Sequence, residues 1–323
     1  MNLYPLKLRP SPSERLWGGT KLTRFISSFS NLIPQDPIGE AWLVYADNKV
    51  INGDYAGKSL QTVADSWAEK LVGTKSMARY GKQIPLLAKF IDAAKPLSIQ
   101  VHPDDSYART HEADSGHLGK TEAWYILEAA PDASIIWGLA EEVDKETLRK
   151  AILGSTLEPY LNVVPVKAGD VIYNEAGKVH AIGAGIFLFE IQQSSDLTYR
   201  LYDYGRKDAS GKVRELHIDK ALEVADLSVG SEAKQTPKPI SDDVTELVRS
   251  DYFVMERWKV DQPILLKTNL DSLELLTVLE GKLNLSAGEH QLELLQGDAA
   301  VLPAALGSYT FAGEATLIRC YVP

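Results

Sequence analysis

A short apolar run near residue 100 carries side chains that could bind a metal ion. In "PLSIQVHPDD", Gln100 and His102 are two residues apart, and Ser98 precedes them at the same spacing. Side chains alternate between the two faces of a strand, so these three residues are expected on one face. Ile99 and Val101 then point to the opposite face.

The same spacing recurs in two other stretches. In "GKTEAWYIL", Lys120 and Glu122 share a strand face, and in "DLTYRLY" Asp196, Thr198 and Arg200 do so. If these faces line one barrel, its interior is polar at one end. Charged groups are rarely buried unless they are paired or bound to a metal.

His102, Glu122 and the later His180 are nitrogen and oxygen ligands of the kinds that Zn²⁺ accepts, and three protein ligands leave an open position for chemistry. Gln100 is a less usual donor, although its carbonyl oxygen is competent. Each motif alone also fits a plainer interpretation. Gln-x-His is typical of a hydrogen-bonded pair, Lys-x-Glu of an exposed ion pair, and a single histidine of a structural role. The spacing alone therefore leaves the metal site open.

The elements that must position these residues are mostly strands. Runs rich in Val, Ile, Tyr and Phe, bounded by Gly, Pro, Asp and Asn, predict strands. The expected strands span 40–46, 97–103, 122–129, 163–166, 185–192 and 197–204. The expected helices span 59–73, 141–155 and 215–225. Strands in runs with segregated helices predict a mainly β fold, largely antiparallel, with helical insertions.

Two parts of the chain resemble each other. "EAWYILEA" parallels "ELLTVLEG", with Glu122 over Glu274, and the Gly-Asp turn at Asp170 parallels the one at Asp298. The repeat predicts two small β-barrels or jelly rolls. His180 falls over a serine, so only the first copy is expected to carry a site. The expected domains are 1–230 with the site, a polar linker at 231–250, and 251–323 as a second β domain without a metal site.

Composition narrows the classes of partner. The chain has 323 residues, a net charge of −10 and no dense Lys/Arg block, which argues against nucleic acid. No apolar run approaches the roughly 20 residues that span a bilayer. The one cysteine, Cys320, allows no disulfide within the chain, and no signal-peptide core is expected at the start, so the cytoplasm is the expected location. An anionic small molecule remains compatible, because local cations can overcome the mean field.

Four stretches together resemble the type I phosphomannose isomerases in their short bacterial form. They are "PLSIQVHPDD", "LGKTEAWYIL", "VHAIG" and "SSDLTYRLYDYGRKDASGKVRELHIDKALEV". The resemblance implies a cupin fold and a zinc-dependent aldose–ketose isomerase. Such an enzyme interconverts mannose 6-phosphate and fructose 6-phosphate through a cis-enediol. It also implies that the C-terminal part is a metal-free cupin domain.

Carried over residue by residue, the resemblance places one zinc ion on Gln100, His102, Glu122 and His180. It would explain why Gln100 and His102 face the same way. The functional arginine of the family falls on Arg200.

The resemblance also implies that Lys89 and Ser98 contact the substrate phosphate. The general base is left open between Lys120, which a nearby zinc ion would favour as a neutral amine, and Glu190. Lys120 is the preferred candidate. For Arg200, the plainer alternative is a structural ion pair with Asp196 or Asp203.

One position departs from the family pattern. Some members have a histidine immediately before the lysine of the KxE motif, where this chain has Gly119. Any role of that histidine as a general acid or base is then absent here, or it is taken by another group, such as His102, His111 or His117.

Three rival functions remain at this stage. The first is an isomerase of another phosphorylated aldose. The second is a cupin dioxygenase, which usually shows a His-x-His pair where this chain has Gln100. The third is a non-catalytic sugar-binding cupin, which would be expected to lose ligands that this chain keeps. The oligomeric state is open, with a monomer as one option.

Overall fold

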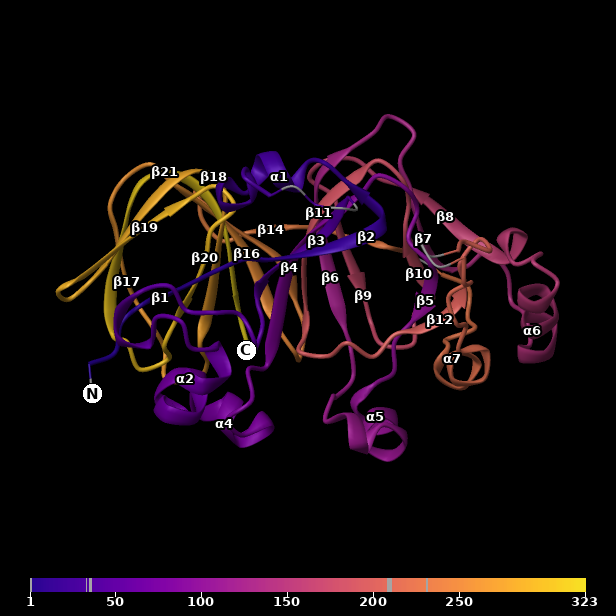
Figure 1. The fold of residues 1–323 in the computed structure, drawn as a ribbon, viewed down its shortest axis with the longest axis horizontal. Helices are drawn as coiled ribbons and strands as arrows, with labels where there is room; N and C mark the ends of the chain where they lie inside the picture. Colours follow the sequence, from indigo (N-terminus) through magenta and orange to yellow (C-terminus); the bar gives the residue numbers. More distant parts are fainter. Residues whose placement is uncertain (1, 33, 35–36, 208–210, 231) are drawn as a thin grey trace.

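Three antiparallel sheets follow one another along the long axis of the molecule (Figure 1). The computed structural model describes residues 2–32, 34, 37–207, 211–230 and 232–323. The mainly β fold predicted from the sequence is confirmed, with seven short α-helices in the described part of the chain. No helix among the described residues combines the length and the apolar character needed to cross a bilayer.

The central sheet has seven strands in the order β13-β9-β6-β11-β4-β2-β3. In chain order they are β2 (Ser11–Gly19), β3 (Ile38–Val44), β4 (Leu86–Ala93), β6 (Glu122–Ala129), β9 (Val171–Asn174), β11 (Ile186–Gln193) and β13 (Lys234–Gln235). Every residue of β4 and β11 is buried, which explains their nearly continuous apolar sequences.

A five-stranded sheet lies at the end of the molecule marked by α6 (Lys145–Leu153) and α7 (Ile218–Val224) in Figure 1. Its strands, in spatial order, are β12 (Tyr199–Tyr202), β5 (Ile99–Val101), β10 (His180–Ile182), β7 (Ser134–Leu139) and β8 (Leu161–Pro165). Apolar residues of β5 and β12 pack with the two helices in one core cluster. The opposite face of β5 is therefore free to carry polar side chains.

The third sheet has nine strands and contains most of the C-terminal part (Figure 1, orange to yellow). They are β1 (Leu6–Leu8), β14 (Lys238–Pro239), β15 (Val244–Arg249), β16 (Val254–Val260), β17 (Ile264–Lys267), β18 (Glu274–Ala287), β19 (His290–Leu295), β20 (Ala299–Leu302) and β21 (Ser308–Tyr321). The N-terminal strand β1 pairs with β20, and residues of both ends share the largest core cluster. The first and last parts of the chain are thus packed together.

The predicted strands correspond to observed ones, with small shifts of their ends. The predicted 122–129 is β6, and 185–192 is β11, which begins one residue later. The predicted linker contains more order than its polar sequence suggested. Within it, β13 pairs with the central sheet, whereas β14 and β15 belong to the nine-stranded sheet. The chain therefore passes from one sheet to the other in this segment.

The helix predicted over 59–73 is divided. Ser59 caps α2 (Leu60–Trp67) by accepting a hydrogen bond from the Thr62 backbone, and α3 (Glu69–Val72) follows after a break at Ala68. Ala68 has a φ of 50°, which interrupts the helix. Gly73 ends α3 as predicted, and a Cβ there would lie 2.4 Å from the backbone of Asp271. A short α4 (Thr74–Tyr80) follows.

The internal repeat is confirmed by the register of the sheets. In the first copy, the Ile126 amide donates to the Asp170 carbonyl, and in the second the Val278 amide donates to the Asp298 carbonyl, both at 3.0 Å. The aligned glutamates also agree, because Glu122 and Glu274 take equivalent places opposite β9 and β20.

The repeat extends to a buried pair of opposite charges. Lys89 of β4 lies beside Glu190 of β11 in the first copy, and Glu256 of β16 lies beside Arg319 of β21 in the second. The charges are reversed between the copies: the lysine of the first copy corresponds to the glutamate of the second, and the glutamate of the first to the arginine of the second. The Arg319 guanidinium contacts Glu274 at 2.7 Å and Glu256 at 3.3 Å.

We expect Arg319→Met to destabilise the protein strongly, because it leaves two buried carboxylates without their cation. Loss of one partner of a buried ion pair costs about 3–5 kcal/mol. Chemical denaturation measures the change in unfolding free energy. Arg257→Met, at an exposed position on β16, is the control and should change stability by less than about 0.5 kcal/mol. Equal effects of the two substitutions would contradict this account.

Candidate metal centre and active site

The five-stranded and central sheets bring two rows of polar side chains together. In the five-stranded sheet, Arg200, Gln100 and His180 lie opposite one another across β12, β5 and β10. The central sheet contributes Glu122 from β6 and Glu190 from β11. The predicted sharing of one face by Ser98 and Gln100 is confirmed, since both line one cavity while Ile99 and Val101 are buried in an apolar cluster.

His102, Glu122 and His180 form a compact buried cluster. Their candidate ligand atoms all lie within 4.8 Å of one another, and each side chain is about 1% exposed. Glu122 bridges the histidines, with Oε2 at 3.3 Å from His102 Nε2 and Oε1 at 3.3 Å from His180 Nε2. The three residues that the sequence singled out as nitrogen and oxygen ligands thus converge on one point.

Both histidines present Nε2 to the cluster because Nδ1 is engaged elsewhere. His102 Nδ1 lies 2.8 Å from the Leu197 carbonyl, and His180 Nδ1 lies 2.8 Å from the Lys178 carbonyl. Nδ1 must donate to these carbonyls, so Nε2 of a neutral ring keeps its lone pair for a metal. Burial and the neighbouring Lys120 ammonium lower the pKa of His102 to about 3, so its ring is neutral.

The Glu122 carboxylate is ionised and incompletely satisfied. Although burial opposes ionisation, the positive charge of Lys120 holds the pKa of Glu122 well below its usual range. Glu122 Oε2 has no hydrogen-bond partner among the described residues, although it lies 3.1 Å from Lys120 Nζ. A divalent cation between Glu122 and the histidines would satisfy this oxygen. The residues present therefore fit a metal ion.

Gln100 is adjacent to the cluster as predicted. Its side-chain amide lies 3.4 Å from His180 Nε2. Rotating the Gln100 amide by 180° would place its oxygen where its nitrogen now lies, and the oxygen is the atom that binds a metal.

Lys89 forms a second charged group beside the cluster. Its Nζ lies 3.0 Å from Glu190 Oε1 and 3.2 Å from Glu40 Oε1, and Arg15 reaches the other oxygen of Glu40 at 2.7 Å. Trp124 Nε1 donates to Glu190 at 2.9 Å and to Glu122 at 3.1 Å, and so connects this group with the cluster.

Burial and the Glu122 carboxylate raise the pKa of Glu190. The pKa of Glu40 shifts in the opposite direction. Although burial disfavours its charge, Lys89 and Arg15 lower the pKa of Glu40 to about 2. Sequence reasoning missed Glu40 and Arg15. A charged residue in the apolar run "IGEAWLV" was the available signal for Glu40, whereas Arg15 carried none.

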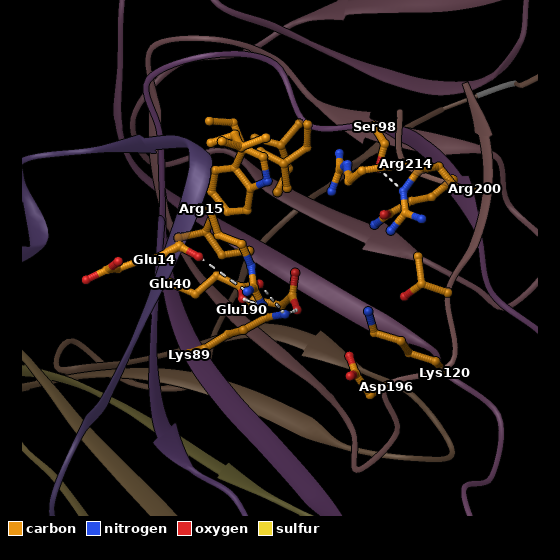
Figure 2. Close-up of a pocket in the computed structure, with 17 residues that line it drawn as sticks. Glu14, Arg15, Glu40, Lys89, Ser98, Lys120, Glu190, Asp196, Arg200 and Arg214 are labelled. Atoms are coloured by element: carbon orange, nitrogen blue, oxygen red, sulfur yellow. Dashed lines mark hydrogen bonds and ion pairs between the residues drawn. The ribbon is translucent and has the colours of Figure 1, made fainter. Parts of the chain in front are cut away.

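A cavity of about 510 Å³ opens onto these groups (Figure 2). The predicted residues Lys89, Ser98, Gln100, Lys120, Glu190 and Arg200 all line it, together with Glu14, Arg15, Trp17, Glu40, Asp196, Thr198 and Arg214, among others. In Figure 2, Lys89, Glu40 and Glu190 gather at one side, and Ser98, Arg200 and Arg214 at another.

Arg200 is held by hydrogen bonds to a neighbouring side chain and to the backbone. Its Nε lies 3.3 Å from Ser98 Oγ and its Nη1 donates to the Glu215 carbonyl at 3.0 Å. Its amide donates to His217 Nδ1. Among the described residues Arg200 forms no ion pair, because Asp203 pairs with Arg206 and Arg214 instead. The plainer interpretation of Arg200, a structural ion pair with Asp196 or Asp203, therefore has no support in the described contacts.

Packing explains why position 119 is a glycine. A Cβ there would lie 2.5 Å from backbone atoms of Asp104 and Asp105, so a histidine would require the loop to move. Two of the suggested replacements have no support in the described contacts. His111 stacks on Tyr107 in α5 (Asp105–His111), and neither His111 nor His117 lines the cavity.

Comparison with known proteins agrees with this geometry. The family description "Phosphomannose isomerase type I, catalytic domain" matches residues 6–122, and "Mannose-6-phosphate isomerase, cupin domain" matches residues 243–322. A mannose-6-phosphate isomerase of Streptococcus mutans is 38% identical over 98% of each chain.

The chain belongs to the type I phosphomannose isomerase family. A mannose-6-phosphate isomerase of Bacillus subtilis is 39% identical over 98% of this chain and 99% of its own length. The crystal structure of the mannose 6-phosphate isomerase from Bacillus subtilis superposes with a TM-score of 0.86, at 33% identity over 98% of this chain and 99% of that one. The resemblance seen in the sequence is confirmed.

Removal of the Glu122 charge should abolish metal binding. We expect wild-type protein to hold about one divalent ion per chain, and Glu122→Gln to hold almost none after dialysis, because the cluster loses its only anionic ligand. Elemental analysis measures this content. Glu128→Gln on the same strand, at an exposed carboxylate, should leave it unchanged. Wild-type metal content in Glu122→Gln would refute the site.

Ionised Glu40 should make the free energy of unfolding depend on pH. Its folded pKa of about 2 lies below the unfolded value of 4.5, so its contribution is complete above about pH 5 and is lost as the pH falls toward 2. The difference in unfolding free energy between wild type and Glu40→Gln should shrink by about 2 kcal/mol between pH 7 and pH 3. Urea denaturation at several pH values measures it, with the exposed Glu69→Gln as control. A difference that does not vary with pH would count against the ionised Glu40.

Proposed function

We propose that this chain interconverts mannose 6-phosphate and fructose 6-phosphate through a cis-enediol, using one Zn²⁺ ion. The observation that carries the proposal is the buried cluster of His102, Glu122 and His180 beside a cavity lined by acid–base groups and arginines. Membership of the type I phosphomannose isomerase family supports it.

Zinc is proposed because two neutral imidazoles and one carboxylate are ligands typical of catalytic zinc. Gln100, whose amide nitrogen lies 3.4 Å from His180 Nε2, would supply a fourth ligand through its carbonyl oxygen after an amide flip. When bound, such an ion polarises a substrate carbonyl and stabilises developing negative charge. The hydrogen bonds from His102 and His180 to backbone carbonyls fix the ring orientations for this purpose.

Lys120 is the preferred general base. Its Nζ lies 3.2 Å from His102 Nε2 and 3.1 Å from Glu122 Oε2, and the residue lines the cavity. A base there can carry the proton between C1 and C2 of an open-chain sugar. Glu190, the alternative, has one oxygen on Lys89 and the other on Trp124, so it is less available.

Arg200 is proposed to stabilise negative charge on the substrate. It faces the cavity beside Gln100, and its planar donors suit an enediolate oxygen or a phosphate. Ser98 and Lys89 were predicted to contact the phosphate. Both line the cavity, which supports Ser98, whereas the two carboxylates around Lys89 compete for its charge.

We also propose that the sheets form two cupin-type barrels or jelly rolls. The five-stranded and central sheets would enclose the catalytic one within 1–230, and the nine-stranded sheet would form the other within 251–323, joined through 231–250. β1 is an exception, since it lies within 1–230 and belongs to the nine-stranded sheet. Within 231–250, β13 pairs with the central sheet, whereas β14 and β15 belong to the nine-stranded sheet. A cytoplasmic location and a small sugar phosphate as the partner, with neither nucleic acid nor a membrane, complete the proposal.

The activity itself is tested with a panel of sugar phosphates in a coupled assay, before and after chelation. We expect mannose 6-phosphate to be the preferred aldose and activity to return when Zn²⁺ is added back. Preference for another phosphorylated aldose would replace the proposed substrate. Binding without turnover, in metal-replete protein, would instead indicate a sugar-binding cupin.

Arg200→Ala should keep the metal and the fold but lose most turnover. If the guanidinium acts on charge that develops in the transition state, kcat should fall by roughly 10²–10³-fold with KM little changed. If it only holds the phosphate in both states, the loss should appear chiefly in KM. Arg200→Lys should not restore it fully, because an ammonium cannot reproduce a bidentate contact. Kinetics and a melting curve on one preparation measure both effects. Normal kinetics with a lowered melting temperature would end the catalytic assignment.

A further inference from the structure

Three arginines and one buried aspartate meet at one end of the cavity. Arg214 donates hydrogen bonds to both carboxylate oxygens of Asp203, from Nε at 2.6 Å and from Nη2 at 2.6 Å. Arg206 contacts the same carboxylate. Arg200 lies beside them, and burial together with the positive charge of Arg214 lowers its pKa. Three cations around one anion leave an excess of positive charge, which is the electrostatic requirement for binding an anionic group.

The two arginines that hold Asp203 face different surroundings. Arg214 lines the cavity, whereas Arg206 does not and donates to the Pro96 carbonyl at 2.6 Å. Asp203 is about 2% exposed, so it orients both guanidiniums without reaching the cavity itself. Among the described residues, Arg214 Nη1 has no protein partner and stays available to a ligand.

The opposite end of the cavity is unsuited to a phosphate. Lys89 lies there, enclosed by Glu40 and Glu190 at 3.2 and 3.0 Å. A phosphate dianion at Lys89 would meet two ionisable carboxyl groups within hydrogen-bonding range of the same ammonium, and like charges repel. Lys89 is better explained as the residue that orients these carboxyl groups.

The arginine end also has the right position relative to the metal cluster. Ser98 lies two residues before Gln100 on the same face of the strand, about 7 Å along it. Ser98 Oγ contacts Arg200 Nε, and Figure 2 shows Arg214 close to both. In an open-chain hexose 6-phosphate, the phosphate lies at the far end from C1 and C2. A substrate with C1 and C2 beside Glu122 therefore extends its phosphate toward this end.

We propose that Arg214 binds the substrate phosphate, together with Arg200 and Ser98, and so makes the site selective for phosphorylated sugars. The inference rests on the proposed function. The salt bridge to Asp203 holds the guanidinium plane in place before the ligand arrives, so less side-chain entropy is lost on binding. Arginine suits the task because its planar donors match phosphate oxygens.

The decisive comparison is Arg214→Met against Arg206→Met. Both remove one cation and one partner of Asp203, but only Arg214 lines the cavity. We expect Arg214→Met to raise KM for mannose 6-phosphate by about 10- to 100-fold, as for loss of a charge-assisted contact, and to leave the metal content unchanged. Arg206→Met should change KM less than about threefold. Equal KM effects of the two substitutions would overturn the proposal.

Inorganic phosphate provides a measurement that does not depend on isomerase activity. It should protect the wild type and Arg206→Met against thermal unfolding, and protect Arg214→Met much less. If the wild type shows no isomerase activity but phosphate protection still requires Arg214, the proposed function fails while the phosphate site stands. If activity is normal and Arg214→Met keeps both its KM and its phosphate protection, the site fails and the function stands.

A conservative substitution covers the case in which Arg214→Met does not fold. Arg214→Lys keeps the positive charge beside Asp203 but loses the planar fork. It should fold and show an intermediate KM, with kcat close to wild type. A wild-type KM in Arg214→Lys, with phosphate protection also unchanged, would mean that the guanidinium makes no specific contact with the phosphate.

Discussion

A buried carboxylate at Glu122 is the constraint on which the site depends. An ionised carboxyl group in a protein interior is costly unless neighbouring groups compensate for it. Glu122 lies beside His102, which directly follows β5, and His180 of β10. Lys120, just before β6, and the Trp124 indole of β6 also contact it. One oxygen still lacks a hydrogen-bond partner among the described residues. The buried negative charge of Glu122 destabilises the folded protein, and for the same reason it makes Glu122 a strong ligand for a divalent cation.

In the C-terminal copy of the repeat, an arginine compensates the charge of the equivalent glutamate. Glu274 takes the place of Glu122, and its charge is compensated by Arg319, while Tyr309 donates to it at 2.8 Å. Arg319 stands where the first copy has Glu190, and Glu256 stands where it has Lys89. An arginine thus stands in the second copy where we propose a divalent cation in the first. The resulting network is fully paired, which suits a domain that stabilises the molecule rather than one that binds a ligand.

Much of this could be predicted from the sequence, because it depends on local periodicity. Alternation along single strands placed Ser98 and Gln100 on one face, and the two Gly-Asp turns fixed the register of the repeat. What escaped prediction depends on pairing between distant strands. Glu40 reaches Lys89 only because β3 pairs with β4, and Arg214 enters the cavity only because Asp203 holds it there. The break at Ala68 and the β1–β20 pairing likewise have no local signature.

The division of charge within the cavity follows from the arrangement of the sheets. The central sheet contributes two carboxyl groups, Glu40 and Glu190, and two cations, Lys89 and Arg15, so the charges on its side are paired with one another. The five-stranded sheet and the segment after β12 contribute arginines in excess over carboxylates. A chain with a net charge of −10 can therefore still offer a local positive field to an anionic substrate, since field strength in a cavity is set by its nearest walls. The gradient from the arginine end to the Glu122 cluster would orient a sugar phosphate with its reacting carbons toward the metal ligands.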